Sequence, residues 1–214
     1  MLMKLENNTE LHTMECRGGI GDYDGGISAD DFKTLLAEHD GHDLTINLDS
    51  EGGIVTDGLA IYNALMDYKG VVTIVVDTLA ASIASVVAMA ADRLIVKSTA
   101  QIMTHRCWTV AAGNAIEFRD LADSMESLDK SIASTYAERT GKSQEEWMAI
   151  LDKDTYFSAE EAVEMGLADE VLYLSKERKP AKAEKKPLAL APVNSASIAR
   201  AKNTARRIKL RLNK

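Results

Sequence analysis

Three residues of this chain have the side chains of a nucleophilic triad. Ser82 stands at the start of a predicted helix, His105 ends a predicted strand, and Asp154 lies in a polar loop. A serine, a histidine and an aspartate can serve as nucleophile, general base and orienting carboxylate. Triads occur in many chain orders, and a serine that begins a helix is most often only its N-cap. The chemistry is therefore a hypothesis that depends on the elements around these residues.

Neighbouring residues leave alternatives open. Asp152 competes with Asp154 for the third position. Cys107 lies two residues after His105, so on a strand both would face one side and could form a Cys–His pair. An ordinary strand cysteine is the plainer interpretation of Cys107. The sequence by itself decides neither question.

A second set of candidates could bind metal. His39 and His42 flank a polar turn but lack an obvious full ligand set, so we expect no metal site. Cys16 and Cys107 are too few for a disulfide framework and indicate reduced thiols in a cytoplasmic protein. The N-terminus has no apolar stretch after its lysine, so no secretory signal is predicted.

Strand and helix patterns alternate along the chain. We expect loops at 18–26 and 152–157, and a turn at 49–53. Such alternation is typical of βαβ units, and it predicts an α/β fold with a mostly parallel sheet. Strands are predicted at 10–17, 44–48, 71–76, 93–96, 101–105 and 168–174. Helices are predicted from Ser28, from Gly53 to about 68, and at 82–91, 114–139, 144–151 and 158–166.

Two of the strand-to-helix turns end in small residues. One contains Gly52-Gly53, and the other contains Ala80-Ala81-Ser82. The first turn of a helix leaves N–H groups unpaired and carries the positive end of the helix dipole. Two such turns placed side by side would form a pocket for an oxyanion.

The segment from Val71 to Ala91 is apolar enough to suggest a membrane span. However, it contains Asp77, and a carboxylate inside the bilayer is costly. Its first part is β-branched and its second part is rich in alanine, which favours a buried strand followed by a turn and a helix. We therefore expect no contact with the membrane.

The charge is distributed unevenly over the 214 residues. Residues 175–214 contain 13 basic and 2 acidic residues, which leaves 12 basic and 31 acidic residues for the rest of the chain. We predict a domain over 1–174 and a basic, disordered tail over 175–214. The acidic domain is a poor partner for nucleic acid. The tail could instead contact nucleic acid, an acidic partner or only solvent, or be cut by the enzyme itself near Leu188–Ala191.

Together, these motifs resemble the ClpP family of serine peptidases. The matching pieces follow the family order between Met14 and Tyr173, about three quarters of the chain. The Tyr62-Asn63-Ala64-Leu65 variant, the compact body and the trailing tail are most similar to the ClpP-like head maturation proteases of tailed phages and prophages. The pieces are Ile46-Asn47, Ser50-Glu51-Gly52-Gly53, Gly58-Leu59-Ala60-Ile61-Tyr62, Ala80-Ala81-Ser82, Ile102-Met103-Thr104-His105, and Asp154 through Phe157–Ala162 to Gly166-Leu167.

The resemblance implies a role for each matching residue. Ser82 would be the nucleophile, His105 the base and Asp154 its orienting partner, and the N–H groups of Gly53 and Ile83 would form the oxyanion hole. No metal or organic cofactor is implied. The fold would be the ClpP/crotonase-type βαβ spiral, with the helix at 114–139 as a protruding handle between stacked homo-oligomeric rings.

The implied substrates are peptides, and for a phage enzyme these would be capsid or scaffold proteins. That processing would occur in the host cytoplasm or the procapsid, and it would not require an unfolding ATPase. An extended substrate would add as a strand alongside Trp108 and Val110.

Three positions depart from the family pattern. Glu51 replaces a proline, Ala84 replaces a glycine two residues after Ser82, and Thr78 replaces a glycine four residues before it. The extra methyl group of Ala84 is expected to crowd the oxyanion pocket. These departures keep two alternatives open: a ring-forming assembly protein with impaired catalysis, and a crotonase-like enzyme acting on acyl-CoA.

Overall fold

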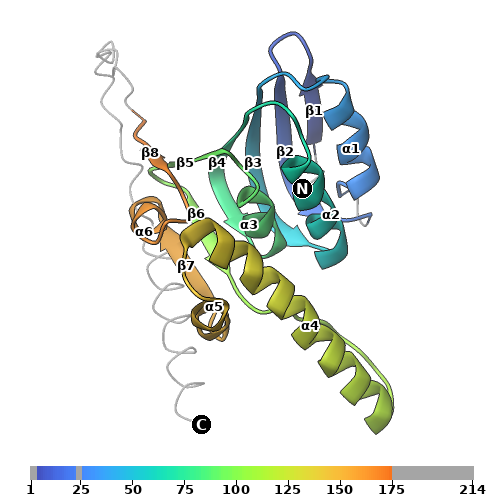
Figure 1. Ribbon diagram of the computed structural model, residues 1–214. Coiled ribbons are helices and arrows are strands. Elements are labelled where there is room, and N and C mark those ends of the chain that lie inside the picture. The colour runs from blue at the N-terminus through green and yellow to red at the C-terminus, as the bar shows by residue number, and fades with distance from the viewer. Residues whose placement is uncertain (1–3, 23–25, 175–214) are drawn as a thin grey trace, which may run out of the picture. The chain divides into compact units, whose positions relative to one another are not determined.

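The computed structural model describes residues 4–22 and 26–174, which form one twisted sheet with six helices (Figure 1). The strands are β1 (Lys4–Asn8), β2 (Thr13–Ile20), β3 (Leu44–Gly53), β4 (Val72–Ala81), β5 (Arg93–Lys97), β6 (Gln101–Thr104), β7 (Thr155–Ser158) and β8 (Glu170–Leu172). The helices are α1 (Ala29–Ala37), α2 (Val55–Met66), α3 (Ile83–Ala88), α4 (Ala115–Thr140), α5 (Gln144–Leu151) and α6 (Ala159–Glu164).

The sheet is mostly parallel, as the alternation of strands and helices predicted. Its main order is β1-β2-β3-β4-β5-β8, and only the β1/β2 and β6/β7 pairs are antiparallel. Strand β4 changes partners along its length. Residues 73–76 of β4 pair with β5, whereas residues 79–81 pair with β6. This change brings β6, and with it β7, to the end of β4 that precedes α3.

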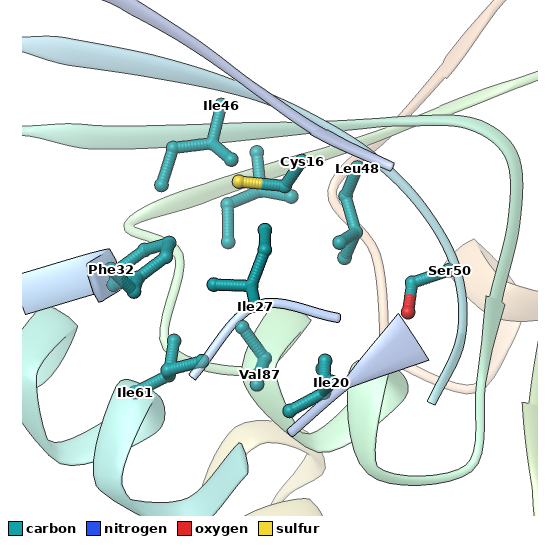
Figure 2. Close-up of a pocket in the computed structure, with 10 residues that line it drawn as sticks. Cys16, Ile20, Ile27, Phe32, Ile46, Leu48, Ser50, Ile61 and Val87 are labelled. Atoms are coloured by element: carbon teal, nitrogen blue, oxygen red, sulfur yellow. The ribbon is translucent and has the colours of Figure 1, made fainter. Parts of the chain in front are cut away.

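The core lies between the sheet and helices α1, α2 and α3, and it extends to buried residues of α4, α5 and α6. Figure 2 shows a part of it, where Cys16, Ile46 and Leu48 from the strands point toward Phe32 and Ile61 from the helices. The cavity enclosed there has a volume of only about 20 Å³ and an almost entirely apolar lining. A space of this size holds about one water molecule, and an apolar lining gives that water too few partners. The cavity is therefore a small packing defect and no ligand site.

Most of the predicted helix starts are confirmed by their caps. The Ser28 hydroxyl accepts a hydrogen bond from the Asp31 N–H at the start of α1. Complete capping boxes begin α4, α5 and α6 at Asn114, Ser143 and Ser158. Each box satisfies two backbone N–H groups that the first turn would otherwise leave unpaired.

Several predicted loops proved wrong, because strand pairing continues through them. The predicted loop at 18–26 begins inside β2, and the predicted turn at 49–53 belongs to β3. The predicted loop at 152–157 contains the start of β7, and β1 was missed altogether. Neighbouring strands supply hydrogen-bond partners to these glycine-rich or polar segments, and local propensity does not reveal such partners.

The apolar segment at 71–91 forms β4 and α3, so its prediction as strand, turn and helix is confirmed. Among the described residues, no helix combines the length and apolar character needed to cross a membrane.

Helix α4 projects from the body, and the chain that follows β6 runs beside it (Figure 1). Its predicted range of 114–139 is shifted by one residue, because Asn114 is the cap. Of the predicted apolar stripe, Ile132 is buried, whereas Leu121, Met125 and Leu128 are half-buried. The first turns of α4 are exposed. The predicted tail at 175–214 lies outside the described residues.

Replacement of Gly58 by alanine is expected to destabilise the fold by about 1–3 kcal/mol through overpacking. A Cβ atom at position 58 would lie 2.1 Å from Cγ1 of the buried Ile83, where α2 packs on α3. Chemical denaturation of the two proteins measures this difference. Gly113→Ala is the matched control, because the three atoms nearest to its Cβ would all belong to the flexible Glu117 side chain. An equal loss of stability in both variants would contradict the packing argument.

Candidate active site

Strand register brings Ser82 and His105 together from positions 23 residues apart. Ala81 of β4 pairs with Met103 of β6, and the Ser82 N–H donates to the Met103 carbonyl at 2.9 Å. His105 follows directly after β6, which ends at Thr104, one residue earlier than predicted. The Ser82 Oγ lies 2.7 Å from His105 Nε2, a distance at which the hydroxyl can donate a hydrogen bond to the imidazole.

Ser82 adopts a backbone conformation that is unusual for a residue with a side chain. Its φ is 54° and its ψ is −130°, between the end of β4 and the start of α3. Such a conformation costs about 1–3 kcal/mol and persists only where surrounding contacts impose it. The sharp turn from strand to helix places the hydroxyl in the cleft described below, and the Ser82 side chain makes no cap hydrogen bond to α3. The plain N-cap interpretation therefore does not describe Ser82.

Asp154 lies on the other side of the imidazole. Thr155, the first residue of β7, pairs with Thr104 of β6, so Asp154 is held beside His105. Its Oδ1 is 3.8 Å from His105 Nδ1, which is longer than a hydrogen bond. The Asp154 side chain is 73% exposed, whereas that of His105 is only 14% exposed. A small movement of the exposed carboxylate would close the remaining distance.

Asp152, the rival for this position, is engaged elsewhere. The Arg106 guanidinium donates to the Asp152 carboxylate at 2.6 Å and to the buried Asp129 carboxylate at 3.1 Å. Asp129 also accepts the Cys107 N–H at 2.8 Å, so α4 anchors the segment that follows His105. The two flanking carboxylates raise the pKa of Arg106, which keeps its positive charge.

Cys107 is a poor rival nucleophile in this arrangement. Burial, followed by its contact with Asp129, raises the pKa of the Cys107 thiol to about 12. A thiol with this pKa stays protonated at neutral pH, and the thiolate is the reactive form. The Cys107 Sγ also donates to the Met125 carbonyl at 3.4 Å, so its hydrogen bond is made with α4.

Gly52 lets the end of β3 lie directly against Ser82. A Cβ atom at Gly52 would lie 2.6 Å from the Ala81 carbonyl oxygen and 2.8 Å from Ser82 Cβ. Its φ of +91° and the φ of +150° at Gly53 also disfavour any side chain. The same hypothetical atom would be 3.1 Å from the Ile83 nitrogen, so the backbones of the two strand-to-helix turns are neighbours.

A cleft of about 520 Å³ opens in front of Ser82 and His105. A second hollow, of about 480 Å³, adjoins it around His105, Asp152 and Asp154. Mixed apolar and polar walls of this kind suit an extended peptide segment. The cleft is lined by Glu51, Gly52, Gly53, Ile54, Val55, Leu79, Ala81, Ser82, Met103, His105, Cys107, Trp108 and Tyr156.

Ser85 and Tyr136 support the site from inside, and no sequence pattern indicated them. The Ser85 Oγ lies within hydrogen-bond distance of the Ser82 carbonyl at 2.5 Å, the Met103 carbonyl at 3.0 Å and the Tyr136 hydroxyl at 2.7 Å. Burial raises the pKa of Tyr136, which therefore remains a neutral donor. These contacts tie α4 to the turn that contains Ser82.

The histidine pair considered for metal binding is used in local contacts. The His42 Nδ1–H donates to the His39 carbonyl at 2.8 Å, and the His39 Nε2–H donates to Asn7 Oδ1 at 2.5 Å. Burial lowers the pKa of His39, which favours its neutral form. Within residues 4–22 and 26–174, no three histidine, cysteine or carboxylate side chains are grouped so that they could hold a metal.

Two departures from the family pattern lie away from the cleft. Ala84 is fully buried in the core beneath Ser82, and its methyl group does not line the cleft. Thr78 is exposed on β4, before the turn. Only Glu51, the third departure, contributes to the cleft wall.

Comparison with known proteins identifies the family of this chain. A family model described as "Clp protease" matches residues 27–174, which is more than half of the chain. The chain is 34% identical over 139 residues to an ATP-dependent Clp protease proteolytic subunit of Chlorella vulgaris, covering 64% of this chain and 69% of that protein. The extent of both matches shows that this chain is a member of the Clp protease family and a serine-type endopeptidase.

Proposed function

We propose that Ser82, His105 and Asp154 form the catalytic triad of this peptidase and that the N–H groups of Gly53 and Ile83 form its oxyanion hole. The observation that carries the proposal is the 2.7 Å contact between Ser82 Oγ and His105 Nε2 inside the cleft. A nucleophile and its general base must lie within hydrogen-bond distance of each other before a proton can be transferred between them.

In the first step, the Ser82 Oγ attacks the scissile carbonyl carbon while its proton moves to His105 Nε2. The carbonyl oxygen becomes an oxyanion, and the N–H groups of Gly53 and Ile83 would stabilise it. The tetrahedral intermediate collapses when His105 donates that proton to the leaving amine. The products are a free amine and an acyl-enzyme on Ser82.

In the second step, water attacks the acyl-enzyme and gives its proton to His105. The collapse of this intermediate releases the acid and restores the Ser82 hydroxyl. In both steps Asp154 would stabilise the imidazolium ion from the Nδ1 side. Its 3.8 Å distance would shorten to a hydrogen bond when substrate orders the exposed loop, because such contacts are often long without substrate.

Labelling with a fluorophosphonate, followed by mapping of the modified peptide, tests the proposed nucleophile. We expect a single modification on Ser82 and none on Ser85, whose hydroxyl is fully buried. Absence of labelling with an intact oligomer would support the assembly protein with impaired catalysis. Release of CoA from acyl-CoA without labelling would support the crotonase-like alternative.

Asp154→Asn is expected to lower kcat/KM by roughly 10²-fold or more, because the imidazolium would lose its partner. Asp152→Asn is the matched variant, two residues away, and it removes a charge that faces Arg106. We expect it to change kcat/KM less than threefold. Peptide hydrolysis by the two variants measures the difference. A larger loss in Asp152→Asn would reassign the third position of the triad to Asp152.

We also propose that the protein assembles into homo-oligomeric rings through α4. Its exposed first turns carry Ile116 and Phe118, and the neighbouring segment exposes Val110. Large apolar side chains that are exposed on a projecting helix favour burial against another copy. Measurement of the native mass tests this proposal, and a monomeric mass at micromolar concentration would contradict it.

For the biological role, we propose cleavage of capsid or scaffold proteins during phage head maturation. The sequence resemblance, including Tyr62-Asn63-Ala64-Leu65 and the basic segment after the domain, supports this role. Incubation with procapsids of the phage or prophage that encodes the chain tests it. Defined fragments of a head protein are expected with the wild-type protein only. If the enzyme cleaves model peptides but leaves the head proteins intact, the role in head maturation would be contradicted, whereas the peptidase activity would not.

A separate proposal concerns the residues from 175 onward. We propose a domain that ends at 174 and a tail that the enzyme cuts near Leu188–Ala191, where small apolar residues interrupt the basic runs. The intact masses of wild-type and Ser82→Ala proteins after long incubation test this cleavage. Equal masses would exclude this cleavage and leave three alternatives for the tail: contact with nucleic acid, contact with an acidic partner, or contact with solvent only.

A further inference from the structure

We infer that Glu51 makes the cleft select peptides with a lysine or arginine side chain next to the scissile bond. This inference rests on the proposed function of the cleft. Glu51 is exposed, lines the same cleft as Ser82 and His105, and directly precedes the Gly52-Gly53 turn. A substrate whose carbonyl reaches Gly53 must therefore pass the Glu51 carboxylate.

The Glu51 carboxylate is not neutralised by a cation among the described residues. In the part of the chain that the structure describes, it makes no ion pair and no side-chain hydrogen bond. A carboxylate left unpaired beside a bound peptide attracts a positive side chain and repels a negative one.

The other charged groups around the cleft add to the negative charge that Glu51 presents to the substrate. Arg106, the cation of the adjoining hollow, is paired with both Asp129 and Asp152. Asp154 is largely exposed and adds a second carboxylate. Among the described residues, the charged side chains of the cleft and the adjoining hollow that lack an arginine or lysine partner are Glu51 and Asp154, so the fixed charge that they present to the substrate is negative.

Two aromatic side chains in the cleft can contact the aliphatic stem of a lysine or arginine side chain. Trp108 is 72% exposed and Tyr156 is 55% exposed, and both line the cleft with Glu51. Lysine and arginine pack their aliphatic stems on apolar surface and place their charges over aromatic faces. The cleft thus offers both an apolar wall and an opposite charge to such a side chain.

The test uses pairs of fluorogenic peptides that differ only in lysine against norleucine, with the variable residue placed in turn on each side of the scissile bond. For at least one position, we expect wild-type kcat/KM to favour lysine about two- to fivefold at low salt, as a single exposed charge pair allows. Glu51→Gln should abolish this preference, and Glu51→Lys should reverse it. The preference should shrink with added salt.

Glu145→Gln is the matched control, because Glu145 is an exposed carboxylate on α5 outside the cleft. It should retain the lysine preference. Binding of the same peptides to Ser82→Ala protein, measured by fluorescence anisotropy, provides a readout that does not require catalysis. Wild-type turnover in Ser82→Ala protein, together with a lysine preference in binding, would reject the proposed triad but support Glu51. An equal preference in wild-type and Glu51→Gln proteins would overturn the inference.

Discussion

Ser82→Ala is expected to lower the turnover of peptide hydrolysis by roughly 10⁴-fold or more, with little change in KM. The variant loses the oxygen that forms the acyl-enzyme, whereas the cleft and the turn around Gly52 remain. A small residual rate above the uncatalysed reaction is expected, because the oxyanion hole can still act on water-mediated hydrolysis. The measurement is the steady-state rate with a fluorogenic peptide, together with loss of fluorophosphonate labelling.

Stability must be measured beside activity in this experiment. Ser82 occupies a strained conformation, so alanine at position 82 retains the same backbone cost but loses the contact with His105. Ser127→Ala, at an exposed position on α4, is the matched control and should retain wild-type turnover. A folded Ser82→Ala protein with wild-type turnover would reject the proposed nucleophile.

His105→Gln is expected to lower turnover by about the same factor as Ser82→Ala, roughly 10⁴-fold. Glutamine can occupy similar space, but it cannot accept the Ser82 proton and return it to the leaving amine. The double variant Ser82→Ala, His105→Gln should lose almost nothing further, because the two residues act as one unit. Single-turnover and steady-state rates of the three proteins measure this non-additivity.

The double variant also shows whether Ser82 and His105 act together or contribute to catalysis independently. If the losses of the single variants multiplied in the double variant, Ser82 and His105 would contribute separately and the proposed proton transfer would be wrong. Circular dichroism and native mass provide the control for folding. His42→Gln is the matched histidine variant, because His42 lies in a turn after α1, outside the cleft.

The sequence allowed the prediction of most helices and of the central strands. Their signals are local: the capping residues Ser28, Asn114 and Ser158 act within one turn, and the β-branched run at 71–76 indicates a buried strand by itself. The triad candidates could be named for a related reason, since residue type and order are visible in the chain. Their chemistry follows from their functional groups, whichever fold contains them.

The strand ends could not be predicted from the sequence, because they depend on pairing between distant residues. β7 was predicted as a loop, although Thr155-Tyr156-Phe157 has the composition of a strand. Its pairing with β6 positions Asp154, so this error concerned an element of the site. Likewise, β3 continues through Gly52 and Gly53 because β2 supplies partners to both residues.

The amino-acid sequence by itself determined the parallel α/β class and the candidate side chains Ser82, His105 and Asp154, because short-range patterns and functional groups are properties of the chain. Only the tertiary structure decided the contacts between them. The change of partner along β4, from β5 to β6, sets the 2.7 Å contact of Ser82 with His105. The pairing of Asp152 with Arg106 likewise leaves Asp154 beside the imidazole. Such contacts form between residues far apart in sequence, where geometry and competing partners select one arrangement among several that residue types alone permit.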